Sequence, residues 1–413
     1  MNLKIFTDNI EYEALEQIKT LTGHPAFSDC KIRIMPDVHA GAGCVIGFTA
    51  NLGDKVIPNI VGVDIGCGML VVNLGQIYID FEKLDEVIKQ YVPSGRSMHS
   101  VETCKEYFFR RFRCYEHLQN IDRLQKSLGT LGGGNHFIEI DADSEDNKYL
   151  VIHTGSRNLG KQVADYYQNL AIEKCNRKHK INYYHNELIE NFKSWGKEKE
   201  INSAWQELNQ WLKKYIPELP KELSYLEGKD RLDYINDMHL CQIFASDNRF
   251  MIARTIMEKM KWDTNDVICE NVLDLLYESK DYECFETIHN YIEPRTNMVR
   301  KGAISAKKGE RVVIPMNMRD GCIIAIGKGN EDWNCSAPHG AGRLMSRKQA
   351  KESIPMIDFK ESMVGIYTTS VDVSTLDESP MAYKPTDEII NHIGDTVEIE
   401  RIIKPIYNYK AKE

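Results

Sequence analysis

The stretch Leu128-Gly129-Thr130-Leu131-Gly132-Gly133-Gly134-Asn135-His136 must form an irregular loop, because helices and strands do not readily tolerate so many glycines. It leads into Phe137-Ile138-Glu139-Ile140, which has the composition of a short strand. The polar residues 141–148 then predict a hairpin turn, and Tyr149-Leu150-Val151-Ile152-His153 predicts the returning strand. We therefore expect a loop and a hairpin within a sheet-rich core.

The chain before this unit predicts strands and tight loops, followed by helices. Residues 31–35 alternate between polar and apolar side chains, and glycines interrupt the sequence up to about Leu74. Residues 81–91 and 101–125 have helical patterning.

The chain after this unit becomes helical and charged between residues 160 and 260, with an insertion expected at 176–232. After Ile288 the glycine-rich strand and loop pattern returns and continues to the end. We therefore predict a mixed α/β (α+β) fold in which residues 1–413 form a single domain. Its sheet-rich core would have flanking helices and a helical insertion at about 160–260, and both ends of the chain would build one site.

Composition narrows the functional classes. The chain has 413 residues, of which 42% are hydrophobic, so it can bury a large core. No segment has the pattern of a signal peptide or a spanning helix, and the 11 scattered cysteines fit reduced thiols. A cytoplasmic protein that does not act at a membrane is the expectation.

The net charge of -9 gives no overall attraction for nucleic acid, so an RNA site would need a local basic patch. Two candidate stretches are residues 295–311, with Arg300 and Lys301, and residues 343–351, with Arg343 and Arg347. The ordinary interpretation is that these charges lie on solvated faces.

A first candidate metal half-site is Asp64-Ile65-Gly66-Cys67-Gly68, where a carboxylate and a thiol are flanked by glycines. Carboxylate oxygen suits manganese, and a thiolate can bridge two ions. By itself such a segment is more often a turn with a buried cysteine.

Three histidines strengthen the metal hypothesis. His136, His153 and His289 each lie where an apolar strand-like run meets a polar loop. With Asp64 and Cys67 they form a set of nitrogen, oxygen and sulfur donors that could hold two divalent ions, as in displacements at phosphorus. Each histidine alone could be purely structural.

A candidate nucleophile is His339 in His339-Gly340-Ala341-Gly342-Arg343. The small residues after it would admit a bulky phosphate, and Arg343 and Arg347 would neutralise that phosphate. The same string could also be only a helix start with glycines for close packing.

Taken together these segments resemble the RtcB family of RNA-splicing ligases, in the family's order and over nearly the whole chain. The resemblance rests on the segments Met35-Pro36-Asp37-Val38-His39, Asp64-Ile65-Gly66-Cys67-Gly68, Gly132-Gly133-Gly134-Asn135-His136-Phe137, His153-Thr154-Gly155-Ser156-Arg157 and His339-Gly340-Ala341-Gly342-Arg343.

The resemblance implies a GTP-dependent, manganese-dependent ligase that joins RNA 3′-phosphate or 2′,3′-cyclic phosphate ends to 5′-hydroxyl ends. His339 would carry GMP, and an RNA-3′-pp-5′-G intermediate would follow. A helper protein that speeds guanylylation is an open expectation, and both tRNA splicing and RNA repair remain open. The implied ligands of two manganese ions are Asp64, Cys67, His136, His153 and His289.

The resemblance also implies a set of nucleotide contacts, with Tyr383 and Lys410 on the guanine. This implied GTP-binding set is Asn135, His136, Phe137, Ile138, Glu139, His289, Asn290, Pro315, Met318, Cys322, His339, Gly340, Ala341, Gly342, Tyr383 and Lys410.

One loop departs from the family pattern. Where the family commonly has a Pro-Gly-Ser-Met-Gly type sequence, this chain has Pro315-Met316-Asn317-Met318-Arg319-Asp320-Gly321-Cys322. Replacing a Gly-Ser pair changes backbone freedom and removes a hydroxyl donor, so contacts from this loop are expected to differ. Arg319 could contact a phosphate instead, or lie on the surface.

Two other hypotheses use the same residues. A dinuclear metal-dependent phosphoesterase would need the metal ligands but no covalent nucleotide carrier such as His339. A non-catalytic RNA-binding protein derived from a ligase would be expected to have lost a ligand or the nucleophile, and all of them are present.

Overall fold

The predicted hairpin is part of the largest sheet of the computed structural model, which describes residues 2–215, 219–262 and 284–411. In this sheet the strands follow the order β11-β12-β15-β5-β6-β4-β7, and β14 pairs with β15. The strands are β4 (Gly68–Gly75), β5 (Phe137–Ala142), β6 (Lys148–Thr154), β7 (Cys284–Ile288), β11 (Arg311–Asn317), β12 (Gly321–Gly327), β14 (Tyr367–Thr368) and β15 (Val397–Lys410). The loop and hairpin predicted at residues 128–153 are confirmed.

This sheet is nearly closed. Its two end strands meet where the backbone N–H of Val313 on β11 donates to Oγ1 of Thr287 on β7, at 3.0 Å. Apolar side chains such as Val71, Val151 and Ile403 fill the space inside the curve of the sheet. The alternation of side chains along each strand then decides which residues point inward and which point outward.

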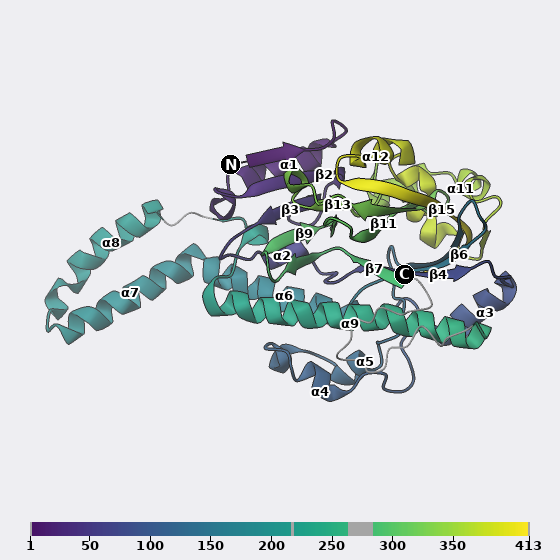
Figure 1. Cartoon of the computed structure of the whole chain (residues 1–413). Coiled ribbons are helices and arrows are strands. Elements are labelled where there is room, and N and C mark those ends of the chain that lie inside the picture. The colour runs from purple at the N-terminus through teal and green to yellow at the C-terminus, as the bar shows by residue number, and fades with distance from the viewer. Residues whose placement is uncertain (1, 216–218, 263–283, 412–413) are drawn as a thin grey trace.

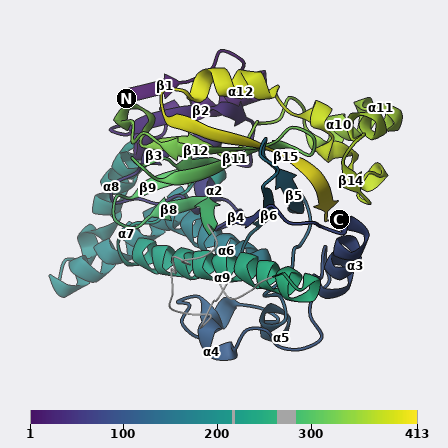
Figure 2. The ribbon, with the colours of Figure 1, turned by 45° about the vertical axis from the view of Figure 1, so that its right-hand side comes forward.

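Two helices cover the outer face of the sheet. They are α3 (Phe81–Tyr91), which has the predicted bounds, and α9 (Gly228–Met260), which runs along the sheet in Figures 1 and 2. Ile138 and Ile152 pack outward against Ile252 of α9.

A smaller sheet has the order β1-β2-β3-β9-β8, in which β1 and β2 are parallel and the other pairs are antiparallel. Its strands are β1 (Asn2–Ile5), β2 (Lys31–His39), β3 (Ile46–Asn51), β8 (Tyr291–Glu293) and β9 (Met298–Lys301). Strands β10 (Ala303–Ser305) and β13 (Ser336–Pro338) form a separate antiparallel pair, and β13 leads directly into His339. This arrangement confirms the prediction of a mixed α/β (α+β) fold with flanking helices.

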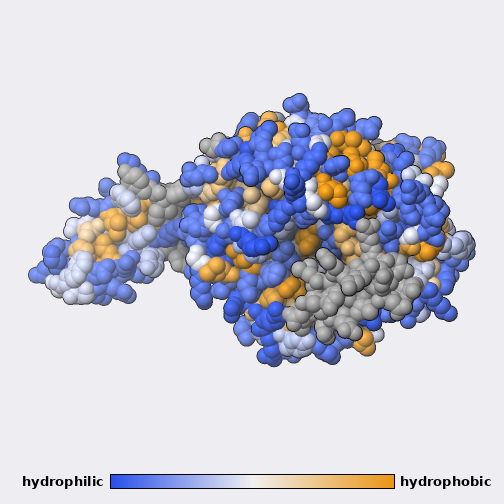
Figure 3. Space-filling model, viewed as in Figure 1, coloured by the Kyte–Doolittle hydropathy of each residue, from blue (hydrophilic) through white to orange (hydrophobic). Residues whose placement is uncertain are grey.

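The predicted helical region contains long helices, and part of it projects from the body. Figure 1 shows α7 (Arg177–Ser194) and α8 (Ile201–Tyr215) extending away, while α6 (Arg157–Cys175) lies beside α9. In the space-filling view, hydrophobic residues gather on this projecting hairpin (Figure 3), and Trp195 and Trp211 are exposed there. Within the described residues, no helix combines the length and apolar character needed to cross a membrane.

Two predictions from local pattern were wrong. Residues 101–125 do not form one continuous helix but the short helices α4 (Glu106–Phe109), η2 (Tyr115–His117) and α5 (Ile121–Gln125), joined by turns. The carbonyl of Gln125 accepts the N–H groups of Thr103 and Cys104 and folds the segment back on itself. After Ile288 the chain also contains helices in addition to strands and loops.

The remaining helices are short. They are α1 (Tyr12–Thr22), α2 (Pro58–Val61), α4 (Glu106–Phe109), α5 (Ile121–Gln125), α10 (Arg347–Ser353), α11 (Met356–Ser362) and α12 (Thr386–Ile393). The 3₁₀ helices are η1 (Pro25–Phe27), η2 (Tyr115–His117), η3 (Glu198–Glu200), η4 (Lys221–Leu223), η5 (Glu331–Trp333), η6 (Val373–Glu378) and η7 (Pro380–Ala382).

Two adjacent, fully buried residues of α9 fix the glycine-rich loop and the strand ends. Oδ1 of Asn248 accepts the N–H groups of Gly129 and Thr130, at 2.7 and 3.0 Å. Nη1 of Arg249 donates to the carbonyls of Gly66 and Thr154, at 3.0 and 2.8 Å. Helix α9 therefore holds the backbone next to Cys67 and next to His153.

Candidate active site

A cavity of about 690 Å³ lies where the strand ends of the large sheet meet the segment after β13. The predicted site residues on its walls are Asp64, Cys67, Asn135, Phe137, Glu139, His153, His289, Asn290, Pro315, Met318, His339, Gly340, Ala341, Gly342, Tyr383 and Lys410. Segments from both sides of the helical region thus build one cavity.

Three predicted site residues do not line this cavity. His136 lies behind Cys67, with Nε2 at 3.6 Å from Sγ. Ile138 points outward into the core beneath α9, and Cys322 is buried inside the curve of the large sheet. The side chains of Ile138 and Cys322 therefore do not reach a ligand in the cavity.

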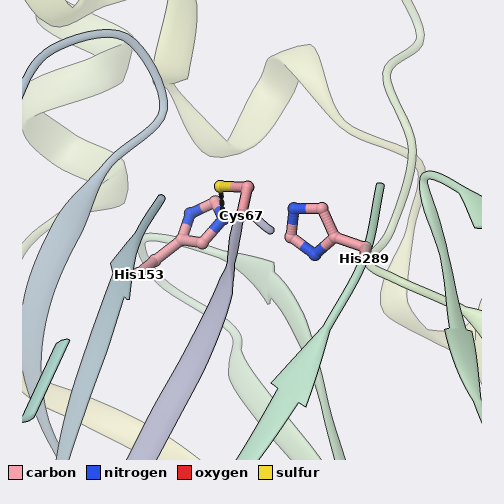
Figure 4. Close-up of side chains that lie close together, drawn as sticks. All are labelled: Cys67, His153 and His289. Carbon is pink, nitrogen blue, oxygen red and sulfur yellow. Dashed lines mark hydrogen bonds between the residues drawn. The ribbon is translucent and has the colours of Figure 1, made fainter. Parts of the chain in front are cut away.

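Cys67, His153 and His289 bring their ligand atoms within 4.8 Å of one another. Sγ of Cys67 is 3.3 Å from Nε2 of His153. Figure 4 shows the three side chains at neighbouring strand ends, directed toward one another. Asp64 lies on the wall of the same cavity, one turn before Cys67.

Strand register explains why these residues meet. Strand β4 lies between β6 and β7, with Met69 opposite His153 and Gly68 opposite Ile288. The residues next to these pairs, Cys67 and His289, are joined by a backbone hydrogen bond of 2.9 Å from the His289 N–H to the Cys67 carbonyl.

Burial sets the protonation of these groups. It lowers the pKa of His136, His153 and His289 well below the ordinary value, so the imidazoles are neutral and have lone pairs to offer. Burial, with the charge of Asp64, raises the pKa of the Cys67 thiol to about 12. Burial also raises the pKa of Asp64. A cation would displace the thiol proton on binding.

The orientation of His153 suits metal binding. Its Nδ1 lies 3.2 Å from the carbonyl of Asn135 and must donate there, because a carbonyl only accepts. This contact leaves Nε2, which faces Cys67, as the free donor atom. Neutral imidazole nitrogens, a thiol and a carboxylate together fit a divalent transition metal.

His339 is held by a buried carboxylate. Asp37, on β2, is fully buried, and its Oδ2 lies 2.6 Å from Nδ1 of His339 and 3.1 Å from the His339 backbone N–H. Because a carboxylate accepts, Nδ1 is the donor in this contact, and Nε2 is the ring nitrogen left for another partner. The His339 ring lies 4.9 Å from the ring of His289, centroid to centroid.

The small residues after His339 allow a close backbone approach. Gly342 has a φ of +77°, and a Cβ there would lie 2.3 Å from the carbonyl oxygen of Asp37. A larger residue would push this segment away from β2 and from the carboxylate that orients His339.

Glu378 is the centre of a buried ionic network on another wall. Its carboxylate lies 2.8 Å from Nζ of Lys410 and 3.0 Å from Nη1 of Arg347, and it accepts from the hydroxyl of Tyr383 at 2.7 Å. Arg343 also contacts it, at 3.3 Å. Burial favours a raised pKa, but Lys410, Arg347 and Arg343 outweigh burial and lower the pKa of Glu378 to about 2.

The predicted basic stretches are only partly solvated. Arg300 is buried and donates to Ser336 and Tyr291, and Lys301 is buried with its amine on the carbonyls of Ala42 and Asn59. The solvated-face interpretation is wrong for these two residues, because both side chains are buried with partners inside the protein, which for Arg300 include Glu293 at 3.3 Å.

Arg319, in the altered loop, pairs with the adjacent Asp320, at 2.8 Å from Nε to Oδ1. Oδ1 of Asn317 accepts the backbone N–H groups of both residues, at 3.0 Å each. The loop is therefore closed on itself, and Arg319 is not among the residues that line the cavity.

Asp37 and Glu378 are the residues that sequence reasoning missed. Asp37 lies within a segment that supports the family resemblance, but nothing local marks it as the partner of a histidine 302 positions away. Glu378 follows Thr375-Leu376-Asp377, a stretch with no motif. The available signal for Asp37 was an acidic residue within the apolar run Ile34-Met35-Pro36-Asp37-Val38.

Comparison with known proteins gives one family. A family model described as "tRNA-splicing ligase RtcB" matches residues 17–114 and 115–411. The chain is 28% identical to the RNA-splicing ligase RtcB of Escherichia coli (strain K12), over 97% of this chain and 95% of that protein. It is 26% identical to the tRNA-splicing ligase RtcB of Aeropyrum pernix, over 97% and 92% of the two chains, and 25% identical to that of Thermococcus kodakarensis, over 92% and 87%.

Glu378→Gln should lower the free energy of unfolding by about 3 kcal/mol at neutral pH, because it leaves buried cations without a counter-charge. The folded pKa of about 2 lies below the ordinary value of 4.5, so the stabilisation is complete above pH 4.5 and is lost as the pH falls toward 2. The difference between wild type and variant should therefore shrink over that range in urea titrations.

The matched control is Glu352→Gln, since Glu352 is exposed and its contact with Lys348 is 3.9 Å long. It should change stability little at any pH. Equal effects of the two substitutions would contradict the assignment of Glu378 as the centre of the network.

Proposed function

The chain belongs to the RtcB family of tRNA-splicing ligases, and on that premise we propose that it is a GTP- and manganese-dependent RNA ligase. It would join an RNA 3′-phosphate or 2′,3′-cyclic phosphate end to a 5′-hydroxyl end. The observation that carries this proposal is His339, held through Nδ1 by Asp37 in the same cavity as the Cys67, His153 and His289 cluster. A hydrolase would need the cluster but not such a histidine.

The donors of the cluster fit the two manganese ions that the proposal requires. Asp64, Cys67, His136, His153 and His289 would hold them, and the Cys67 sulfur lies near both His136 and His153. When bound, the ions would place positive charge beside the phosphate oxygens.

The first step would be guanylylation of His339. Nε2 attacks the α-phosphorus of GTP, a P–N bond forms, and pyrophosphate leaves with the electron pair of the broken P–O bond. Asp37 orients the ring through Nδ1 and stabilises the positive charge that develops on the imidazole. Gly340 and Gly342 leave room for the phosphate beside the ring.

The next steps would transfer and then release GMP. An oxygen of the RNA 3′-phosphate attacks the phosphorus on His339, which breaks the P–N bond and gives the RNA-3′-pp-5′-G intermediate. The 5′-hydroxyl of the second RNA attacks the RNA phosphate, and GMP leaves as a phosphodiester forms. Both tRNA splicing and RNA repair would use this sequence.

The cavity suggests how GTP would be held. Asn135, Glu139 and Asn290 line it beside the cluster, with Phe137, Pro315 and Met318 as further wall residues. Tyr383 and Lys410, proposed for the guanine, are both fixed by Glu378. Because Ile138 and Cys322 do not line the cavity, their side chains are left out of this proposal.

We further propose that residues 1–413 act as a single ligase domain with the helical region at about 160–260 as an insertion. In support, β4 and β6 precede that region and β7 and β15 follow it, yet all four belong to one sheet.

Incubation with α-labelled GTP and manganese should leave acid-labile label on the denatured wild-type protein and none on His339→Ala. The physical reason is that a phosphoramidate survives denaturation but hydrolyses in acid. His392→Ala, whose ring contacts the carbonyl of Glu388, is the control and should keep the label. Absence of label from the wild type would favour a metal-dependent phosphoesterase.

Asp37→Asn should slow label incorporation about 100-fold or more, since the imidazole loses the charge that fixes its tautomer and balances its charge in the transition state. The single-turnover rate of guanylylation measures this effect. Asp332→Asn, at an exposed position, should have no effect. A rate for Asp37→Asn within a few-fold of wild type would remove Asp37 from the mechanism.

Cys67→Ala should abolish both guanylylation and RNA joining and should reduce the bound manganese, because the cavity loses its sulfur donor. Metal analysis and ligation of an RNA with a 3′-phosphate measure the two effects. Cys335→Ala is the control, since the Cys335 thiol donates to the carbonyl of Gly329 and does not line the cavity. Full ligation by Cys67→Ala would exclude this residue from the metal site.

A further inference from the structure

A second cluster of metal-ligating side chains lies inside the curve of the large sheet. Glu139 and Asp141 point inward from β5, and Cys322 points inward from β12. One ligand atom from each residue lies within 4.8 Å of the others. All three residues are buried, at 3%, 0% and 1% exposure.

Both Asp141 carboxylate oxygens and the Asn408 amide oxygen are buried acceptors without a hydrogen-bond donor among the described residues. No N–H or O–H group of the described residues donates to either carboxylate oxygen of Asp141, which faces the Cys322 thiol instead. Asn408, on the strand between β5 and β12, donates its amide to Glu139, while its own Oδ1 is also buried without a partner. Leaving such buried acceptors unsatisfied destabilises the folded protein, because they have lost their hydrogen bonds to water.

The described surroundings of the cluster are mainly apolar. Apolar side chains, including Val151, Ile324 and Ile403, fill the interior around the cluster. The amine of Lys410 is near Glu139 but is occupied by Glu378 and the carbonyl of Asn135. Burial raises the pKa of Glu139 to about 7 and the pKa values of Asp141 and Cys322 well above ordinary, so without a cation this cluster retains protons.

We propose that Glu139, Asp141 and Cys322 bind a divalent transition-metal cation of the zinc class, at a site separate from the cavity cluster. Two carboxylates and a thiolate match the donors zinc accepts, whereas magnesium and calcium take oxygen alone. The cation replaces the retained protons and satisfies the acceptors of Asp141. It also ties β5 to β12 across β15.

This site has a consequence for the cavity. Glu139 lies on the cavity wall as well as in the buried cluster, so the cation fixes its carboxylate from behind. The two clusters have different cysteines, Cys67 and Cys322, which makes them separable by experiment. The proposal does not depend on the ligase reaction.

The test uses cobalt(II), which absorbs in the near ultraviolet when a thiolate binds it. The full chain carrying Cys67→Ala, stripped of metal and titrated with cobalt, should still show this band. Adding Cys322→Ser should remove the band, and adding Cys335→Ser instead should leave it. Lack of a band in Cys67→Ala, or its survival with Cys322→Ser, would overturn the proposal.

A second variant controls for misfolding of the first. It also distinguishes a cluster that binds a cation from one that only retains its protons. Added to Cys67→Ala, Asp141→Asn should weaken cobalt binding by more than about 100-fold. The loss of a direct ligand weakens metal binding more than the loss of a residue that only hydrogen-bonds to a ligand. With zinc the substitution should lower the melting temperature, and with chelator it should raise it by removing a buried carboxyl. The same rise under both conditions would show that the cluster holds only protons.

Discussion

The register of β4 between β6 and β7 is the constraint on which the site depends. It places Cys67, His153 and His289 at one edge of the sheet, and a slip of one residue would turn the strand side chains to the other face. Arg249 secures this register from α9, since one guanidinium binds the carbonyls of Gly66 and Thr154. The apolar packing of α9 on the outer face therefore determines where donor atoms meet on the inner edge.

Around this edge, charged side chains are stabilised by buried partners and not by contact with water. Asp37 is fully buried and faces His339, while Glu378 is buried among Arg343, Arg347 and Lys410. In a medium that solvates charge poorly, each of these groups is stable only with its partner in position. The same condition makes the Glu139, Asp141 and Cys322 cluster unusual, because within the described residues neither carboxylate oxygen of Asp141 has a hydrogen-bond partner.

Features set by local sequence could be predicted, and features set by distant pairing could not. The glycine-rich loop, the hairpin and the helix at residues 81–91 follow from composition and periodicity, and the structure has all of them. Residues 101–125 have helical periodicity, but hydrogen bonds to the Gln125 carbonyl favour turns. The burial of Arg300 and the parts played by Asp37 and Glu378 depend on residues far away in the chain. The cavity residues were predicted from the family resemblance and from the position of polar residues at strand ends. Ile138 does not line the cavity, because side chains alternate along β5 and Ile138 points to the outer face.

Strand β15 pairs with β12 through residues 397–403 and with β5 through residues 404–410, so it joins the two halves of the large sheet. During synthesis on a ribosome, β5 and β12 emerge long before this strand does. Until residue 410 has emerged, each of them presents an unpaired edge that can recruit another nascent chain. The cavity also lacks the amine of Lys410 during that time. The last strand of the sheet therefore sets both the period of greatest aggregation risk and the moment at which the site is complete.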